Sequence, residues 1–264
     1  MPQDKANSAL PDAMCTLLTK MFVLRVSNLL YMQVIITGAS KGIGKAIAEQ
    51  FAAAGHTLFI CSRSEKGLYD TVADLQTRYP QSTIKARPVD MSVQEEVKAF
   101  AAWCLGFGTP DVLVNNAGQF MPGAVHNEPD GTLEQMIQVN LYSAYHLTRS
   151  LLPAMMKAQK GHVFNICSIA SLHAYPNGGS YSISKFALLG FSKNLREEMK
   201  PYGIKVTAVS PGATMSASWD GFEIDPQRIM EAADIAKMVY AASQLSPMAV
   251  VEDIILRPQL GDLD

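Results

Sequence analysis

The sequence predicts an α/β fold in which one parallel β-sheet is covered by helices on both faces. Short apolar runs rich in β-branched residues, such as Val34-Ile35-Ile36, alternate along the chain with longer segments that have apolar residues at helical spacing. A glycine-rich turn stands between the first of these runs and the first helical segment. Strands and helices that alternate in this way form parallel sheets buried on both faces.

The elements can be placed in order along the chain. The predicted strands cover residues 34–36, 57–61, 83–89, 111–114, 162–167, 204–209 and 250–256. The predicted helices cover residues 43–54, 68–79, 93–105, 133–157, 180–200 and 233–243. Gly55 and Pro80 end the first two helices, and we expect Pro153 to kink the long fourth helix near its end. Right-handed crossovers between seven parallel strands favour a doubly wound, Rossmann-type sheet.

Composition argues against several classes of function. The chain has 264 residues, enough for one large domain, and its formal net charge of −2 offers no basic field for nucleic acid. No run of eighteen uncharged apolar residues occurs, so we expect no membrane span. The four cysteines and five histidines have neither metal-ligand nor disulfide spacing. We therefore expect no metal site, and reduced, buried thiols in a cytoplasmic protein.

The first 31 residues differ from the rest of the chain. Residues 14–31 contain no acidic residue and are mainly apolar, interrupted by the basic residues Lys20 and Arg25, which resembles a poor targeting segment. No spacer for a cleavage site separates this segment from the first predicted strand, and Met32 stands immediately before that strand. We expect residues 1–31 to be a dispensable extension and residues 32–264 to form a single domain.

The first candidate site is the turn that follows the first strand, with the spacing G-x-x-x-G-x-G. Ligands of doubly wound sheets bind beyond the carboxyl ends of the strands, where this turn lies. Its glycines let the backbone approach a pyrophosphate, and the N-terminus of the next helix favours the phosphate charge. A tight turn without a ligand is the alternative interpretation. The residues expected to bind a dinucleotide here are Gly38, Ser40, Lys41, Gly42, Ile43 and Gly44.

The residues after the second strand indicate which dinucleotide is bound. A site that selects NAD usually carries an acidic residue there, which binds the ribose hydroxyls. This chain has Ser62-Arg63 instead, and Lys41 adds a second cation. A guanidinium binds a 2′-phosphate with a planar fork of donors, whereas a carboxylate would repel it. The sequence therefore favours NADP(H), although Arg63 could be an ordinary solvated loop residue.

Tyr181 and Lys185 form the second candidate site. Residues four apart share one face of a helix, so the phenol and the ammonium can point into the same cleft. A nearby cation favours the phenolate and lowers the pKa of a tyrosine, which normally lies near 10. Such a tyrosine can exchange a proton with an alcohol or a carbonyl oxygen. Taken alone, the pair could equally belong to a solvated helix face.

Taken together, these motifs resemble those of the classical short-chain dehydrogenases/reductases. The resemblance covers residues 32–264 in the family's order and spacing. Besides the glycine-rich turn, it rests on Asp90, Asn115-Asn116-Ala117-Gly118, Asn140, Ser168, Tyr181, Lys185 and Pro211-Gly212. The combination is specific, whereas a Y-x-x-x-K or N-N-A-G motif alone is not.

The resemblance implies a role for each matching residue. Tyr181 would be the proton donor or acceptor, and Ser168 would hydrogen-bond and orient the substrate oxygen. Lys185 would bind the nicotinamide ribose and lower the pKa of Tyr181, and Asn140 would support a water-linked proton relay through Lys185. The alternatives are a polar residue at a helix bend for Asn140 and a strand-end cap for Ser168. The remaining cofactor contacts would come from Asp90 at the adenine, from Asn116, Ala117 and Gly118 along the cofactor, and from Pro211, Gly212 and Thr214 at the nicotinamide.

These roles predict NADPH-dependent reduction of a ketone or aldehyde to an alcohol. The nicotinamide supplies the hydride, and the protein must place the carbonyl and supply a proton. We expect the substrate to be held by residues 119–125, 171–177 and 213–228, whose apolar side chains suggest an apolar or flat molecule. These side chains include Phe120, Met121, Tyr175, Met215, Trp219 and Phe222.

The C-terminal segment bears on the substrate and leaves alternatives open. The tail departs from that of 3-oxoacyl-carrier-protein reductases and is more similar to the sepiapterin-reductase-like and broad carbonyl-reductase branch. There Asp262 could pair with the aminopyrimidine of a pterin, or it could be an exposed, disordered terminal carboxylate. The chain could instead be an NADP-binding regulatory protein or a structural protein. The resemblance also implies a homodimer or homotetramer formed through the helices 133–157 and 180–200.

Overall fold

Seven parallel strands form one sheet in the computed structural model, which describes residues 31–215 and 225–262. The strand order is β3-β2-β1-β4-β5-β6-β7, as the doubly wound prediction requires. The predicted extension lies outside the described residues, apart from Tyr31. The strand bounds are β1 Gln33–Thr37, β2 Thr57–Ser62, β3 Thr83–Pro88, β4 Val112–Asn115, β5 Gly161–Ile166, β6 Ile204–Pro211 and β7 Asp253–Leu256.

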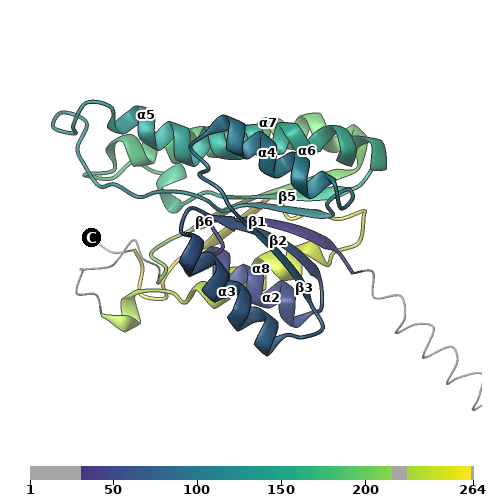
Figure 1. Ribbon diagram of the computed structural model, residues 1–264. Helices are drawn as coiled ribbons and strands as arrows, with labels where there is room; N and C mark the ends of the chain where they lie inside the picture. The colour runs from purple at the N-terminus through teal and green to yellow at the C-terminus, as the bar shows by residue number, and fades with distance from the viewer. Residues whose placement is uncertain (1–30, 216–224, 263–264) are drawn as a thin grey trace, which may run out of the picture. The chain divides into compact units, whose positions relative to one another are not determined.

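Helices cover both faces of this sheet (Figure 1). Helices α2, α3 and α8 pack on one face, and α4, α6 and α7 pack on the other. The α-helix bounds are α2 Gly42–Ala53, α3 Glu65–Arg78, α4 Gln94–Leu105, α5 Thr132–Ile137, α6 Ser143–Ala158, α7 Gly179–Met199 and α8 Ala232–Ser243. The predicted Rossmann-type fold is thereby confirmed.

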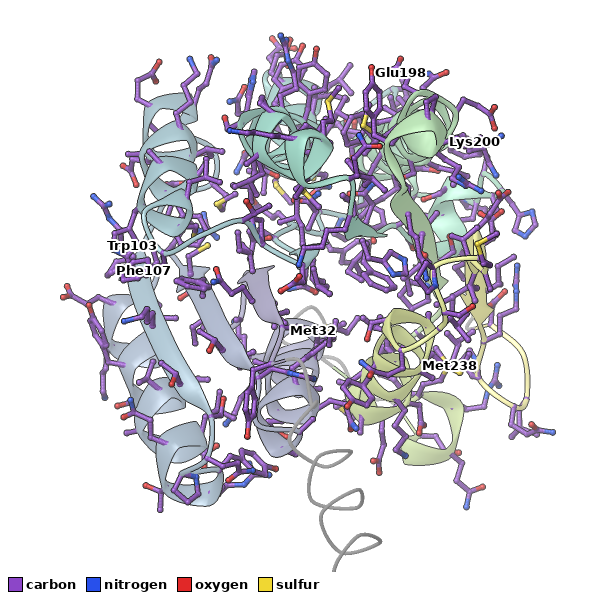
Figure 2. All side chains as sticks on the ribbon, turned by 90° about the vertical axis from the view of Figure 1, so that its right-hand side faces the viewer. Met32, Trp103, Phe107, Glu198, Lys200 and Met238 are labelled. Carbon is purple, nitrogen blue, oxygen red and sulfur yellow. The ribbon has the colours of Figure 1, made fainter. Side chains whose placement is uncertain are left out.

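The strand sequences explain the two layers. Successive side chains of a strand point to opposite faces, so an apolar run serves both layers. In β1, Val34 and Ile36 face the layer of α2, whereas Ile35 between them faces the layer of α4. All three side chains are fully buried. At the far end of the second layer, Trp103 and Phe107 pack around Phe59 (Figure 2).

Three elements differ most from the sequence prediction. Helix α3 begins at Glu65 instead of residue 68, because the Ser64 hydroxyl accepts a hydrogen bond from Gly67 N at 3.1 Å and caps the helix. Strand β7 is shorter than predicted and covers Asp253–Leu256. The helix predicted over residues 133–157 is divided into α5, a π-helical turn at Gln138–Tyr142 and α6. Its α-helical hydrogen bonding therefore breaks at this turn, whereas Pro153 is accommodated inside α6.

The strand order defines where a ligand can bind. The chain runs outward from β1 to β3 on one side of the sheet and from β4 to β7 on the other. The crossover loops therefore diverge at the carboxyl ends of β1 and β4, where doubly wound sheets bind their ligands. Both Gly38 and Asn116 stand directly beyond these two strand ends.

Within the described residues, no helix is long and apolar enough to cross a membrane, and no group of acidic, histidine or cysteine side chains could hold a metal ion. Cys61, Cys104 and Cys167 are buried and free, as predicted for them.

His162 is a buried titratable group within β5. Its ring stacks on Phe164, and its Nε2 lies 2.7 Å from the Thr207 hydroxyl. Because that hydroxyl donates to the Val251 carbonyl at 2.6 Å, His162 Nε2 is assigned as the donor to it, and burial keeps the ring neutral. Burial lowers the pKa of His162 from 6.5 to about 3, and the charge of Lys205 acts in the same direction.

This lowered pKa predicts acid sensitivity. Below pH 6.5 the unfolded chain gains a proton at His162 that the folded chain does not take up until near pH 3. The free energy of unfolding should thus fall with decreasing pH by up to about 1.4 kcal/mol per pH unit from this residue alone. His162→Gln should reduce that slope between pH 6 and 4 in denaturant titrations. Equal slopes for the variant and the natural chain would contradict the assignment.

Candidate active site

The glycine-rich turn is fastened to the loop after β4. The Thr37 hydroxyl accepts hydrogen bonds from Asn116 N and Ala117 N, at 3.0 and 2.9 Å. In return, the Asn116 side-chain amide donates to the carbonyls of Thr37 and Gly38, at 2.9 and 3.1 Å. The Asn116 amide group therefore braces the turn, a role that the sequence did not predict. Ala117 and Gly118 follow Asn116 directly in the chain.

Gly44 lets helix α2 start close against this brace. A Cβ atom at Gly44 would lie 2.4 Å from both the Gly38 carbonyl oxygen and the Asn116 Nδ2. The first turn of α2 contains no acidic residue, so nothing in that turn neutralises the positive end of the helix. Lys41 is exposed at the N-cap position of α2, and Ser40 precedes it. This arrangement suits a phosphate group.

The ends of β2 and β3 lie beside the turn. Ser62 is buried, and its hydroxyl donates to the Ser64 carbonyl at 3.2 Å, so it is engaged within the protein. Arg63 is exposed. Burial acts to raise the pKa of Asp90, but two hydrogen bonds from Ser92 and the charge of Arg63 outweigh it and lower the pKa overall. The charge of Arg63 therefore acts directly on the Asp90 carboxylate.

The chemistry of these groups fits a dinucleotide with an extra phosphate. The exposed cations Arg63 and Lys41 lie at the carboxyl ends of the strands, near the N-terminus of α2, which has no acidic residue in its first turn. The position after β2, where a carboxylate would bind ribose hydroxyls, carries the guanidinium of Arg63. Asp90 is the acidic group at the next strand end, and its carboxylate is held by Ser92.

Ser168 and Tyr181 meet at the end of β5. Ser168 acts on the Tyr181 phenol as a side-chain hydrogen-bond partner. Ser168 also caps the short 3-10 turn Ile169–Ser171, because its oxygen accepts from Ala170 N at 3.1 Å. Both sequence interpretations of Ser168 are therefore compatible with its position. Burial raises the pKa of Tyr181 to about 12, although the hydrogen bond from Ser168 acts in the opposite direction.

Lys185 lies one helical turn beyond Tyr181 and is buried. Its Nζ donates to the Ile166 carbonyl at 2.9 Å and stands 5.8 Å from the centre of the Tyr181 ring. Burial lowers the pKa of Lys185 to about 8. The expected lowering of the Tyr181 pKa by Lys185 is not seen in this structure, because desolvation of the phenol dominates and the net shift is upward.

Asn140 occupies the π-helical turn and is almost completely buried. Its Oδ1 accepts from Gln119 N at 2.7 Å, and its Nδ2 donates to the Gln119 carbonyl and to the Ser184 hydroxyl. The side chain therefore ties the loop after β4 to helix α7. A Cβ atom placed on Gly118 would lie 3.2 Å from Asn140 Oδ1 and 3.5 Å from Lys185 Nζ, so all these groups meet at one point. The sequence did not single out Ser184, which lies inside the Y-x-x-x-K motif.

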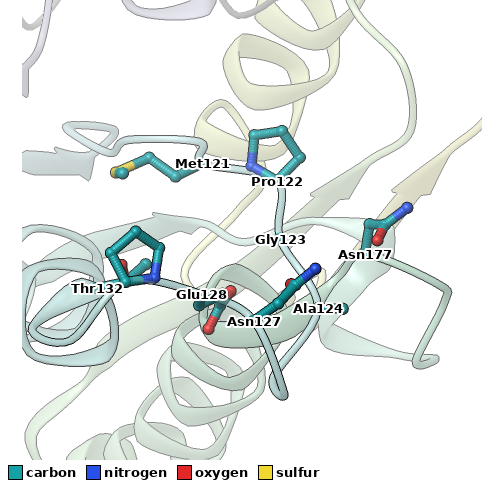
Figure 3. Close-up of a pocket in the computed structure, with 9 residues that line it drawn as sticks. Met121, Pro122, Gly123, Ala124, Asn127, Glu128, Thr132 and Asn177 are labelled. Carbon is teal, nitrogen blue, oxygen red and sulfur yellow. The ribbon is translucent and has the colours of Figure 1, made fainter.

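Two of the expected substrate segments lie beside this cluster. Phe120 packs edge-on against the Tyr181 ring, with the ring centres 4.8 Å apart. Met121 lines a cavity of about 330 Å³ with the residues around Glu128 and with Asn177 (Figure 3). From the third segment, Met215 is exposed, whereas Trp219 and Phe222 lie outside the described residues.

The turn after β6 carries the last predicted cofactor residues. Pro211 ends β6, Gly212 N donates to the Leu256 carbonyl, and the Thr214 hydroxyl donates to the Gly212 carbonyl. The C-terminal segment folds against this turn, and Asp262 Oδ1 lies 3.1 Å from the place that a Cβ atom on Gly212 would take.

Asp262 is held in place by two arginines. Its carboxylate pairs with Arg257, and its main-chain carbonyl accepts from Arg228 Nη2 at 2.8 Å. Arg257 also contacts His173 Nε2 at 2.6 Å, which connects the C-terminal segment to the loop after Ser168. Asp262 is therefore paired and only partly exposed in this structure.

A Rossmann-type sheet with a glycine-rich turn after β1 and a serine–tyrosine–lysine set after β5 defines a nucleotide-dependent oxidoreductase. The family model described as short chain dehydrogenase matches residues 32–225, and the chain belongs to this family.

Named relatives agree with this assignment. The sepiapterin reductase of Chlorobaculum tepidum is 32% identical over 238 residues, which cover 87% of this chain and 97% of that protein. Dehydrogenase/reductase SDR family member 7B of Xenopus laevis is 38% identical over 184 residues, which cover 68% of this chain but only 57% of the frog protein. Among solved structures, an alcohol dehydrogenase from the archaeon Thermococcus sibiricus, complexed with 5-hydroxy-NADP, is 26% identical with a TM-score of 0.82 and covers 88% of this chain and 99% of its own.

Proposed function

We propose that this short-chain dehydrogenase reduces the carbonyl group of a ketone or aldehyde to an alcohol with NADPH, using Tyr181 as the proton donor. The observation that carries the proposal is the position of the buried Lys185, whose Nζ lies 5.8 Å from the centre of the Tyr181 ring, together with Ser168, which acts on the phenol as a hydrogen-bond partner. Two hydroxyls that meet in this way can both reach one substrate oxygen. Such an arrangement stabilises the negative charge that develops on that oxygen during reduction.

Different residues of the chain would bind the cofactor and act on the substrate. NADPH, when bound, supplies the hydride. Arg63, Lys41 and the N-terminus of α2 would hold its phosphates, and Lys185 and the turn after β6 would hold its nicotinamide end. Ser168 orients the carbonyl oxygen, and Tyr181 delivers a proton to it. Phe120 packs edge-on against the phenol ring.

The pKa of Tyr181 is compatible with a role as proton donor. A phenol whose pKa is raised to about 12 keeps its proton at neutral pH and can donate it. Lys185, with its pKa lowered to about 8, releases a proton more readily than an exposed lysine. It is therefore suited to restore the proton that Tyr181 gives away.

Tyr181→Phe should remove the proton donor while leaving the ring in place. We expect kcat with NADPH and a diketone to fall by about a hundredfold or more, and NADPH binding to be largely unchanged. Steady-state kinetics and fluorescence titration with NADPH measure the two quantities. Tyr69→Phe removes the same atom from an exposed tyrosine of α3 and should turn over normally. A Tyr181→Phe variant as active as the natural chain would refute the mechanism.

The preference for NADPH over NADH should depend on Arg63. Arg63→Glu should raise the KM for NADPH by roughly tenfold or more, because a charge-assisted contact to the 2′-phosphate is replaced by repulsion. The KM for NADH should change much less. Lys66→Glu makes the same charge change at an exposed position of α3 and serves as the control. If both variants change the KM for NADPH and the KM for NADH equally, Arg63 does not bind the 2′-phosphate.

A pterin side-chain carbonyl is the second candidate substrate. The similarity to the Chlorobaculum tepidum sepiapterin reductase over nearly its whole length favours it. So does Asp262, whose Oδ1 is buried beside Gly212 without a hydrogen-bond partner among the described residues. An unpaired carboxylate oxygen is costly to bury and could accept from the amino group of a pterin.

A substrate panel with NADPH distinguishes the candidates. The panel should contain sepiapterin, small diketones and acetoacetyl thioesters. If the pterin proposal is right, Asp262→Ala should lower kcat/KM for sepiapterin by about tenfold or more and leave diketone reduction nearly unchanged. Equal losses for both substrates would mean that Asp262 only supports the C-terminal segment.

The form and location of the enzyme are also proposals. Tyr142, Ile183 and Phe186 are exposed apolar side chains in and next to α6 and α7, which supports a homo-oligomer formed through these helices. Sedimentation of the full chain would give its stoichiometry. The buried, free Cys61 and Cys167 are compatible with a cytoplasmic protein.

A further inference from the structure

The loop between β4 and α5 reaches the start of helix α7, which carries Tyr181 and Lys185. Glu128 in this loop binds Ser180 twice: Oε1 accepts from Ser180 N at 2.9 Å, and Oε2 accepts from Ser180 Oγ at 2.5 Å. The first turn of α7 has no acidic residue of its own, and its N-cap residue makes no side-chain cap. Glu128 therefore supplies the helix cap from 52 residues away in the sequence.

The contact between this loop and α7 leaves no spare space. A Cβ atom at Gly179 would lie 2.1 Å from Glu128 Oε1 and 2.4 Å from the Gly123 carbonyl oxygen. Gly123 N also donates to the Asn177 carbonyl at 3.0 Å. Figure 3 shows Gly123, Glu128 and Asn177 around the same cavity. The two loops that flank the candidate substrate site are thus fastened together at the start of α7.

The same loop also contacts the tyrosine ring. Phe120 packs edge-on against Tyr181, with the ring planes at 86° to each other. Tyr181 directly follows Ser180 in the chain, so the loop holds both the main chain next to Tyr181 and its ring. A shift of this helical turn would move the phenol hydroxyl relative to Ser168.

We propose that Glu128 is a positioning residue for the proton donor. Its carboxylate fixes the first turn of α7 through Ser180 and thereby keeps the Tyr181 hydroxyl against that of Ser168. The inference rests on the proposed function, in which Tyr181 gives the proton. Both oxygens of the Glu128 carboxylate bind Ser180, so we expect Glu128 to act through Ser180.

The test compares Glu128→Ala, Glu128→Gln, Ser180→Ala and the double variant Glu128→Ala/Ser180→Ala in the full chain. Glu128→Ala should lower kcat by roughly ten- to a hundredfold, because small misplacements of a catalytic group are costly, while the Kd for NADPH stays unchanged. Glu128→Gln keeps an acceptor for Ser180 N and should recover most of the activity. The double variant should be no worse than Glu128→Ala, because the two residues act through one contact.

Glu198→Ala is the matched control, since Glu198 is exposed near the other end of α7 (Figure 2). Hydrogen exchange provides a readout that does not depend on activity. The amides of Ser180 and Tyr181 should exchange faster in Glu128→Ala than in the natural chain, whereas those near Glu198 should not. A role limited to stability would lower the melting temperature without lowering kcat at a temperature where the variant is fully folded.

The inference is overturned if folded Glu128→Ala has the kcat of the natural chain. It is also overturned if the loss of kcat in the double variant equals the combined losses of Glu128→Ala and Ser180→Ala. Tyr181→Phe separates this failure from failure of the proposed function. If Tyr181→Phe is inactive but Glu128→Ala is normal, only the positioning role is wrong. If Tyr181→Phe is fully active, the proposed function itself fails.

Discussion

The geometry of the site depends on the burial of one ammonium group. Lys185 lies almost wholly inside the protein, and a buried charge needs hydrogen-bond acceptors to offset its desolvation. The Ile166 carbonyl at the end of β5 provides one at 2.9 Å. This bond fixes the rotation of α7 about its axis, because Lys185 must face the sheet. Tyr181, four residues earlier on the same helical face, then reaches Ser168 just beyond β5.

Polar side chains around the site carry structural as well as chemical roles. Ser168 caps the 3-10 turn that follows it, and Asn116 braces the glycine-rich turn. Asn140 ties the loop after β4 to α7 through Ser184. Each of these side chains is held by hydrogen bonds to other elements, which leaves little freedom for its rotamer. A site built this way is preorganised, so binding and reaction require little reorganisation of the protein.

The sequence was sufficient for the fold and for the chain positions of the proposed site, because both follow from local patterns. Apolar periodicity placed the strands, and the spacing of Tyr181 and Lys185 placed them on one helical face. The π-helical turn around Asn140 has no such signal, since its hydrogen-bond register depends on the neighbouring helices. The contact of Glu128 with Ser180 joins residues far apart in sequence. The sign of the Tyr181 pKa shift could not be predicted either, because it depends on how deeply the phenol is buried.

That sign changes the chemical interpretation of the tyrosine–lysine pair. A strong effect of the Lys185 charge would favour the phenolate, which is a base and suits oxidation of an alcohol. In this structure desolvation is the largest influence on the pKa of Tyr181, which is raised to about 12, and the phenol holds its proton. Desolvation also lowers the pKa of Lys185. The pKa of Lys185 then lies below that of Tyr181, which is the order needed for Lys185 to return a proton to Tyr181 after the phenol has given one away. The burial that sets the orientation of α7 therefore also keeps the proton on Tyr181, from which it can be donated. The geometry and the electrostatics of the site thus have the same cause.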